Sequence, residues 1–117
     1  MSFASDISSI LSGVSGVYGG NMPAHTTAKN AVCIRRTGGF PRSASGTEVE
    51  EPTFQVTVRN EVYATGEGVC NTIKDLLHGY VGGKFLVILQ QGDVFDLGRD
   101  ENDLQLWSIN FRCYYRR

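Results

Sequence analysis

The chain has 117 residues and a formal net charge of −1, and 41% of its residues are hydrophobic. This length suits one domain spanning residues 1–117, with a core that needs no stapling by disulfides or metal. The balanced charge argues against bulk attraction to nucleic acid or membrane. No apolar run approaches the roughly 20 residues of a membrane-spanning helix.

The cysteines and the first residues predict a protein that folds in a reducing compartment. Cys33, Cys70 and Cys113 lie far apart, form no C-x-x-C motif and occur in apolar surroundings. This spacing favours buried, reduced thiols over a metal or redox site. The first residues lack the basic region of a signal peptide, so we expect folding in the cytosol of the producing cell.

The first half of the chain predicts one short helix followed by two or three strands. Apolar residues at helical spacing mark residues 7–14, and the glycines after them can end the helix. A strand stub is expected at 17–18 and a buried strand at 31–36. Residues 37–51 contain glycines and a proline without apolar periodicity, which predicts a long loop. Residues 52–60 alternate between apolar and polar side chains, as a half-buried strand does.

The second half predicts a helix and then two strands. Asn60 is a favourable N-cap for a helix over residues 61–78, and Gly79 suits the position just after it. Gly66 would let this helix approach a sheet closely. The apolar stripe expected on the helix consists of Val62, Val69, Ile73, Leu76 and Leu77. Residues 84–91 read as a strand buried on both faces over its middle, and residues 105–117 alternate most regularly of all.

This order of elements predicts an α+β domain, with a mixed, mostly antiparallel sheet and two helices packed on one face. Such an arrangement would leave the opposite face of the last strand open. Leu104, Leu106 and Tyr114 lie there, opposite Trp107 and Ile109. Apolar residues on an open face indicate an interface. The alternative is that another helix or loop covers them.

The acidic stretch from Asp93 to Asp103 has three candidate interpretations. An EF-hand loop fails because a start at Asp96 places Glu101 where glycine is needed, and a start at Asp100 places Leu104 at a ligand position. A catalytic carboxylate pair needs one acid in an apolar pocket, whereas these acids stand among polar residues. The remaining interpretation is the tip of a β-hairpin, since Asp and Asn favour turns. A protein contact at this tip is the second possibility.

No other residue pattern predicts catalysis. His25 and His78 have no evident partners, and the sequence contains no nucleophile elbow, phosphate-binding loop or zinc-protease motif. We therefore expect no enzyme activity, catalytic residue, metal or cofactor. A small ligand-binding domain or enzyme remains as an alternative, with a site built from Tyr63, His78, Tyr114 and the acidic hairpin.

Four segments, read together, resemble a known family. They are TGGFP after a strand, EEPTFQVTVRN leading into a helix that ends LLHG, LQQGDVFDLGRDEN, and WSINFRCYYR. In this order and spacing they are similar to the minor capsid or tail terminator proteins of long-tailed bacteriophages. The resemblance runs from about Ala31 to the C-terminus.

The resemblance implies a structural virion protein. In that family six copies form a ring at the head-proximal end of the tail tube, which stops tube polymerisation and meets the head-completion (stopper) protein. DNA passes through the ring, so tight phosphate binding would be a disadvantage. The family fold is a mixed sheet flanked by helices, and no catalytic residues are implied. A head-completion or tail-completion adaptor is the neighbouring alternative.

A ring needs two different patches on each subunit that complement one another. The sequence offers basic and acidic clusters for this purpose, together with the loop at 37–51 and the apolar face described above. The residues expected to contact a second subunit, the tube protein or the stopper are Arg35, Arg36, Phe40, Arg42, Glu48, Glu50, Glu51, Asp93, Asp96, Arg99, Asp100, Glu101, Leu104, Leu106 and Tyr114.

Overall fold

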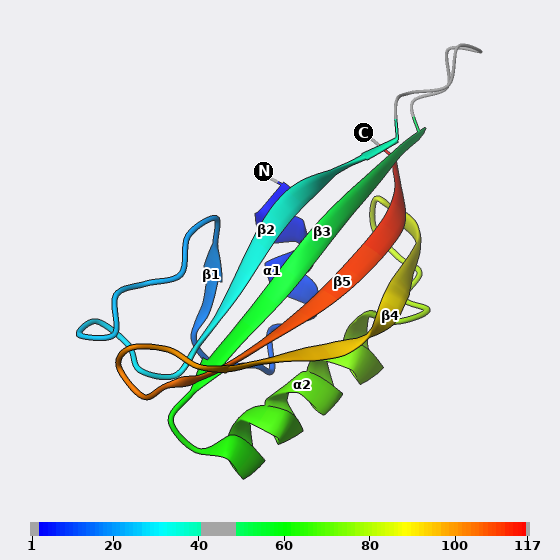
Figure 1. Cartoon of the computed structure of the whole chain (residues 1–117). Helices are drawn as coiled ribbons and strands as arrows, with labels where there is room; N and C mark the ends of the chain where they lie inside the picture. The colour runs from blue at the N-terminus through cyan, green and yellow to red at the C-terminus, as the bar shows by residue number, and fades with distance from the viewer. Residues whose placement is uncertain (1–2, 41–48, 117) are drawn as a thin grey trace.

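A computed structural model describes residues 3–40 and 49–116 of the chain (Figure 1). Within these ranges the chain forms two helices and five strands, and none of the helices is long and apolar enough to span a membrane. The elements in chain order are α1 (Phe3–Ile10), β1 (Val17–Gly19), β2 (Ala31–Phe40), β3 (Val49–Asn60), α2 (Tyr63–Leu77), β4 (Phe85–Arg99) and β5 (Gln105–Arg116).

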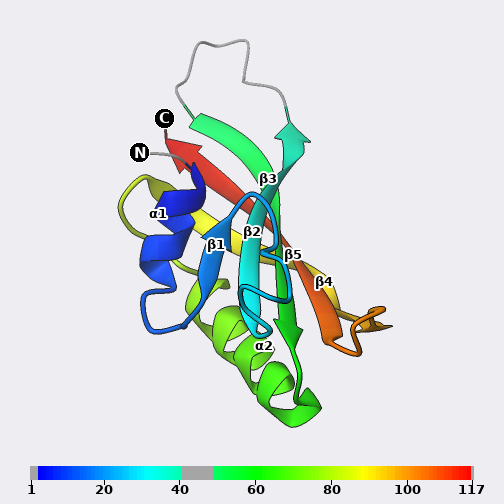
Figure 2. The ribbon, with the colours of Figure 1, turned by 90° about the vertical axis from the view of Figure 1, so that its left-hand side faces the viewer.

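The strands form one twisted sheet in the order β1-β2-β3-β5-β4. The short β1 runs parallel to β2 at one edge (Figure 2), and every other neighbouring pair is antiparallel. The predicted α+β class and the mixed, mostly antiparallel sheet are therefore confirmed. The long strand β4 forms the other edge.

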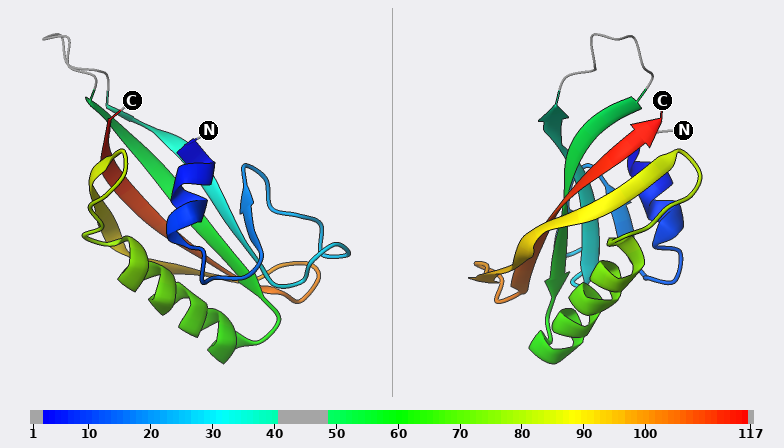
Figure 3. Two further views of the ribbon diagram at one scale, coloured as in Figure 1. Left: turned by 180° about the vertical axis from the view of Figure 1, so that it is seen from behind. Right: turned by 90° about the vertical axis from the view of Figure 1, so that its right-hand side faces the viewer.

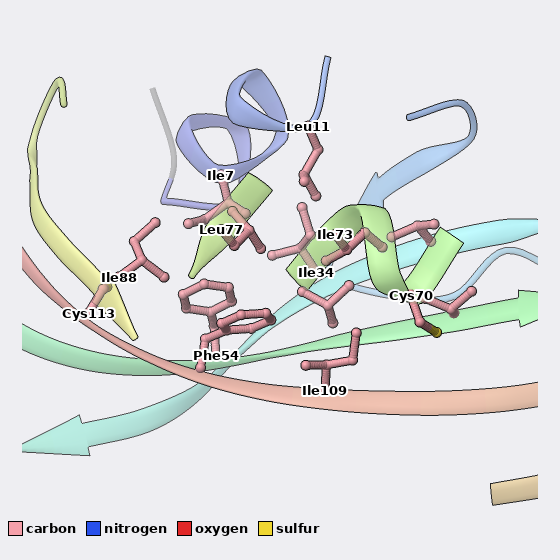
Figure 4. Packing of buried hydrophobic residues seen from close by; sticks show 14 of the residues in the cluster. Ile7, Leu11, Ile34, Phe54, Cys70, Ile73, Leu77, Ile88, Ile109 and Cys113 are labelled. Carbon is pink, nitrogen blue, oxygen red and sulfur yellow. The ribbon is translucent and has the colours of Figure 1, made fainter. Parts of the chain in front are cut away.

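One hydrophobic core joins both helices to the sheet. Seen from behind, α1 and α2 both lie in front of the sheet (Figure 3, left). Figure 4 shows Ile7 of α1 and Ile73 of α2 in one cluster of buried side chains with Ile34 of β2. Phe54 and Phe111 stack at the centre with ring centroids 5.2 Å apart, and neither ring is accessible to solvent. Burying an aromatic or aliphatic side chain of this size contributes about 1.5–3 kcal/mol, so this cluster holds the layers together.

The β2–β3 connection is shorter than the sequence pattern indicates. β2 continues to Phe40 and β3 begins at Val49, so the predicted loop over 37–51 is wrong at both ends; its middle, 41–48, lies outside the described residues. Two of the glycines that favoured a loop, Gly38 and Gly39, lie inside β2. Gly39 has φ +138°, and a Cβ there would stand 2.4 Å from the carbonyl oxygen of Glu51 on β3. Glycine is needed for that close backbone approach.

The second helix begins later than predicted. Val62 occupies the N-cap position, so the assignment of Asn60 as N-cap is wrong. The Asn60 side-chain oxygen instead accepts a hydrogen bond from the backbone N–H of Val62 at 2.9 Å. Gly79 follows the C-cap residue with φ +80°, as expected.

The buried face of α2 is rotated from the predicted stripe. Its buried residues are Gly66, Cys70, Ile73 and Leu77, whereas Val62 and Leu76 are exposed. A Cβ at Gly66 would stand 2.2 Å from the ring of Trp107 on β5. The expected close approach of the helix to the sheet at Gly66 is therefore confirmed.

Strand β4 extends far beyond residues 84–91. It continues to Arg99 through register shifts between Gln91 and Phe95 and between Asp96 and Gly98, which are β-bulges. The predicted burial of the strand's middle on both faces is found on one face only, since Ile88 is buried, Val87 and Leu89 are half-buried and Leu86 is exposed.

The segment after α2 covers the outer edge of the first half of β4. The backbone N–H of Ile88 donates to the Tyr80 carbonyl at 3.1 Å, and that of Gln90 donates to His78 Nδ1 at 3.0 Å. Open edge positions therefore lie on the second half of β4.

Candidate assembly surfaces

The last part of the acidic stretch, Asp100 to Asp103, forms the tip of the β4–β5 hairpin, as predicted, whereas Asp93 and Asp96 lie within β4. Asp100 Oδ1 accepts hydrogen bonds from the backbone N–H groups of Asn102 and Leu104, at 2.8 and 3.0 Å. Asp103 has φ +61°, a left-handed conformation that Asp tolerates better than most residues. Asp and Asn are therefore present at the tip for turn chemistry, whatever else the tip contacts.

The charges at this tip are only partly paired within the chain. Arg99 lies 3.5 Å from the carboxylate of Asp103, in a pair that is largely open to solvent. Such pairs contribute little to stability. Glu101 is exposed, and it makes no ion pair with another described residue. The tip therefore presents negative charge to solvent.

Two acids within β4, Asp96 and Asp93, are exposed but have partners in the same chain. Asp96 accepts hydrogen bonds from the Tyr63 hydroxyl at 3.0 Å, the Gly98 backbone N–H at 2.9 Å and the Gln105 side chain. The Gly98 N–H, followed by the Tyr63 hydroxyl, lowers the pKa of Asp96, and the bond to Asp96 raises the pKa of Tyr63. This contact ties β4 to α2 and β5. Asp93 lies 3.7 Å from Lys74 on α2.

The basic residues Arg35 and Arg112 share the sheet face opposite the core. Arg35 pairs across strands with Gln55, and Gln55 pairs with Asn110, two residues before Arg112 on β5. Alternate residues of a strand share a face. The Gln55 amide donates to Asn110 Oδ1 at 3.3 Å and to Ser108 Oγ at 3.4 Å. The part of this surface around Gln55, which belongs to the open face of the sheet, is therefore polar.

The arginines of this region have no carboxylate partner among the described residues. The ion pairs among all the described residues are Lys29–Glu61, Lys74–Asp93 and Arg99–Asp103. Arg112 instead lies 5.8 Å from the ring centroid of Tyr114, and its Nε has no hydrogen-bond partner within the described chain. Arg36 points the other way and lies 5.3 Å from the ring of Phe3.

The remaining predicted interface residues fall into three groups. Leu104 is 4% exposed, so the expectation that it presents an open apolar surface is wrong, whereas Leu106 and Tyr114 are half-buried. Leu104 is enclosed because it closes the turn that Asp100 organises. Glu50 and Glu51 are half-buried at the start of β3. Arg42, Glu48 and the side chain of Phe40 lie outside what the structure describes.

Sequence reasoning missed two apolar residues on the second half of β4. Phe95 and Leu97 are 54% and 55% exposed. Phe95 pairs with Ser108 and so lies on the open face. Their alternation with Asp96 within VFDLG could have marked this segment as strand.

The groups of the alternative ligand-binding site come together only in part, because Tyr63 meets Asp96 of the acidic stretch while His78 and Tyr114 lie elsewhere. Tyr63 and His78 lie at opposite ends of α2, roughly 22 Å apart at 1.5 Å per residue. Tyr114 lies on the open face, beside Arg112. Among residues 3–40 and 49–116, no group of three or more His, Cys, Asp or Glu side chains could hold a metal ion.

A groove of about 620 Å³ lies between the turn after α1, the start of β2 and α2. Val14, Val69 and Thr72 are among the residues that line it. Its one charged wall residue, Arg59, is 7% exposed and donates to the carbonyls of Ala28 and Lys29. Because that guanidinium is already hydrogen-bonded to backbone carbonyls, the described residues that line the groove include no free charged group for catalysis.

The three cysteines are buried and unpaired, as predicted. Burial raises the pKa of Cys70 to about 11 and that of Cys113 to about 12, and it also raises the pKa of Cys33. A thiol reacts as the thiolate, so at neutral pH these side chains act as small core residues.

Comparison with known proteins identifies the family. Residues 4–117 match the family described as bacteriophage tail terminator protein. No curated protein matches the sequence. A solved chain from the "Virion of native gene transfer agent (GTA) particle" superposes with a TM-score of 0.60 at 13% identity, over 95% of this chain and 84% of that one, which shows a shared fold. Because the family match covers nearly the whole sequence, the resemblance seen in the sequence is confirmed, and the chain belongs to the bacteriophage tail terminator proteins, a family of structural phage tail proteins.

Proposed function

We propose that this protein ends the phage tail tube by forming a ring, with six copies expected, at the head-proximal end of the tail. The observation that carries the proposal is the family match over residues 4–117. The ring caps the last ring of tube protein, stops further polymerisation and presents its other side to the head-completion (stopper) protein. It assembles in the host cytoplasm and remains in the virion.

A closed ring requires each subunit to offer two different, complementary surfaces. We infer that α1 and α2 cover one face of the sheet, so that the open face and the β4–β5 hairpin remain available for contacts. The exposed Phe95 and Leu97 support this, since exposed apolar side chains close together mark contact surfaces. The other proposed contact residues are those named from the sequence, apart from the buried Leu104.

The proposed ring carries out no chemistry. DNA passes through it without sequence-specific binding, and the balanced charge of the subunit suits that passage because strong phosphate binding would retard the DNA. We propose no enzymatic activity and no cofactor. The separation of Tyr63, His78 and Tyr114 supports this over the ligand-binding alternative.

Tube length in the presence of the purified protein tests the proposal. Tube protein of the same phage is polymerised with and without this chain, and tubes are measured by negative-stain electron microscopy. Termination predicts shorter tubes, each with a ring at one end. Tubes of unchanged length without end-bound protein would refute it.

The adaptor alternative predicts a different result in the same experiment. A head-completion or tail-completion adaptor would leave tube polymerisation unchanged and bind to purified portal-containing heads. A monomer that binds neither tubes nor heads would favour the ligand-binding alternative.

A further inference from the structure

The charges of the open face and of the hairpin tip are complementary but cannot meet within one chain. Arg112 lies seven residues along β5 from Gln105, a separation of roughly 23 Å at about 3.3 Å per strand residue, and the tip lies beyond Gln105. Screening acts over about 8 Å at physiological salt. Figures 1 and 3 show the tip at the opposite end of the sheet from the C-terminal end of β5, in a molecule 49 Å long.

The same hairpin also carries the exposed apolar side chains. Phe95 and Leu97 stand a few residues before the tip and are each more than half exposed. On the receiving side, Tyr114 is half-buried beside Arg112. Each surface therefore combines an apolar or aromatic element with charge, and the charges are opposite, which is the pairing that steers and orients protein association.

We infer that the β4–β5 hairpin of one copy docks on the open face of the next copy, with Glu101 facing Arg35 and Arg112. This inference rests on the proposed ring and specifies its repeating contact. The contact is heterologous, because the hairpin tip and the open face are different surfaces, and repeating it around an axis closes a ring.

A charge swap tests which residues meet. Glu101→Lys and Arg35→Glu are made singly and together, since both side chains are exposed and neither forms an ion pair with another described residue. Matched controls are Asp75→Lys on α2 and Lys84→Glu before β4, two exposed charges outside both surfaces. Ring assembly is followed against concentration by mass photometry, with tube ends present if the wild type forms rings only there.

The inference predicts a specific pattern. Each single reversal raises the concentration for half-assembly by about tenfold or more, because attraction becomes repulsion at every contact of the ring. The double variant recovers part of this loss, because the reversed pair attracts again while Arg112 still repels the new positive charge, and the two controls do not differ from the wild type. Thermal unfolding of all variants stays within about 2 °C, as expected for exposed positions.

The opposing outcomes separate this inference from the proposed function. If the wild type forms rings and the single reversals leave the midpoint unchanged, or the double variant assembles no better than the weaker single variant, the proposed pairing is wrong while the ring stands. If the wild type forms no ring even on tube ends, the proposed function fails.

Discussion

The two faces of the sheet differ sharply along the same strands. On β5, Ile109 and Phe111 are wholly buried against the helices, whereas the intervening Asn110 and Arg112 are half-buried polar residues. The side chains of the core face are packed closely against the helices, so their loss would leave cavities. The open face is held by cross-strand hydrogen bonds such as Gln55 to Asn110, whose groups can exchange partners with water or another protein. Stability and assembly can therefore be altered separately.

The largest difference between the faces is expected from two adjacent truncations on β5. Phe111→Ala removes a ring stacked on Phe54 and should lower the free energy of unfolding by about 3–5 kcal/mol. Asn110→Ala, one residue away on the open face, should cost less than about 1.5 kcal/mol, the typical contribution of one hydrogen bond. Urea unfolding followed by circular dichroism measures both. Equal losses would show that the open face is packed as tightly as the core.

A second comparison uses two glycines of α2 that face opposite environments. Gly66→Ala places a methyl group against the Trp107 ring and should destabilise the fold by about 1–3 kcal/mol. Gly68→Ala meets nothing within 4 Å and should stabilise the helix by about 0.5–1 kcal/mol. Thermal unfolding should therefore shift in opposite directions for the two variants. A neutral Gly66→Ala would mean that the helix can move away from Trp107 at little cost.

These glycines also show how far sequence reasoning reaches. The alternation over residues 105–117 predicted β5, and the helical spacing predicted α2, because both signals arise from one buried face. Gly39, in contrast, resembled a loop residue although it lies within β2, where backbone approach to β3 requires it. Local composition cannot distinguish a turn from a close contact between distant segments.

The same limit applies to the candidate surfaces. The acidic tip was predictable, because turn chemistry depends on neighbouring residues. The exposure of Phe95 and the enclosure of Leu104 depend on the bulges of β4 and on the Asp100 turn. The meeting of Tyr63 with Asp96 joins residues 33 positions apart. Such features are set by the register of the hairpin, which the sequence pattern did not define.

High pH should weaken the core face through Tyr115. Its hydroxyl donates to Asp6 on α1, and burial, together with that bond, raises its pKa to about 12. The contribution of the neutral phenol is complete below about pH 10, the usual tyrosine pKa, and is lost as pH rises toward 12. The stability difference between wild type and Tyr115→Phe should therefore fall over this range. A constant difference would show that Tyr115 does not contribute to the loss of stability at high pH. The buried thiols also have raised pKa values, but their contribution is the same in both proteins and cancels in the difference.

The smallest effect is expected at low pH from the exposed contact of Asp96. Its pKa is lowered, so its contribution is present above the ordinary aspartate pKa of about 4 and is lost as pH falls through the lower value in the folded state. The stability advantage of wild type over Asp96→Asn should shrink below about pH 4. Tyr63→Phe removes one donor but keeps the Gly98 N–H, the largest cause of the lowered pKa, so this variant should retain most of the pH dependence. If Tyr63→Phe abolishes it, the link to α2, rather than the backbone of the β4 bulge, holds the carboxylate ionised.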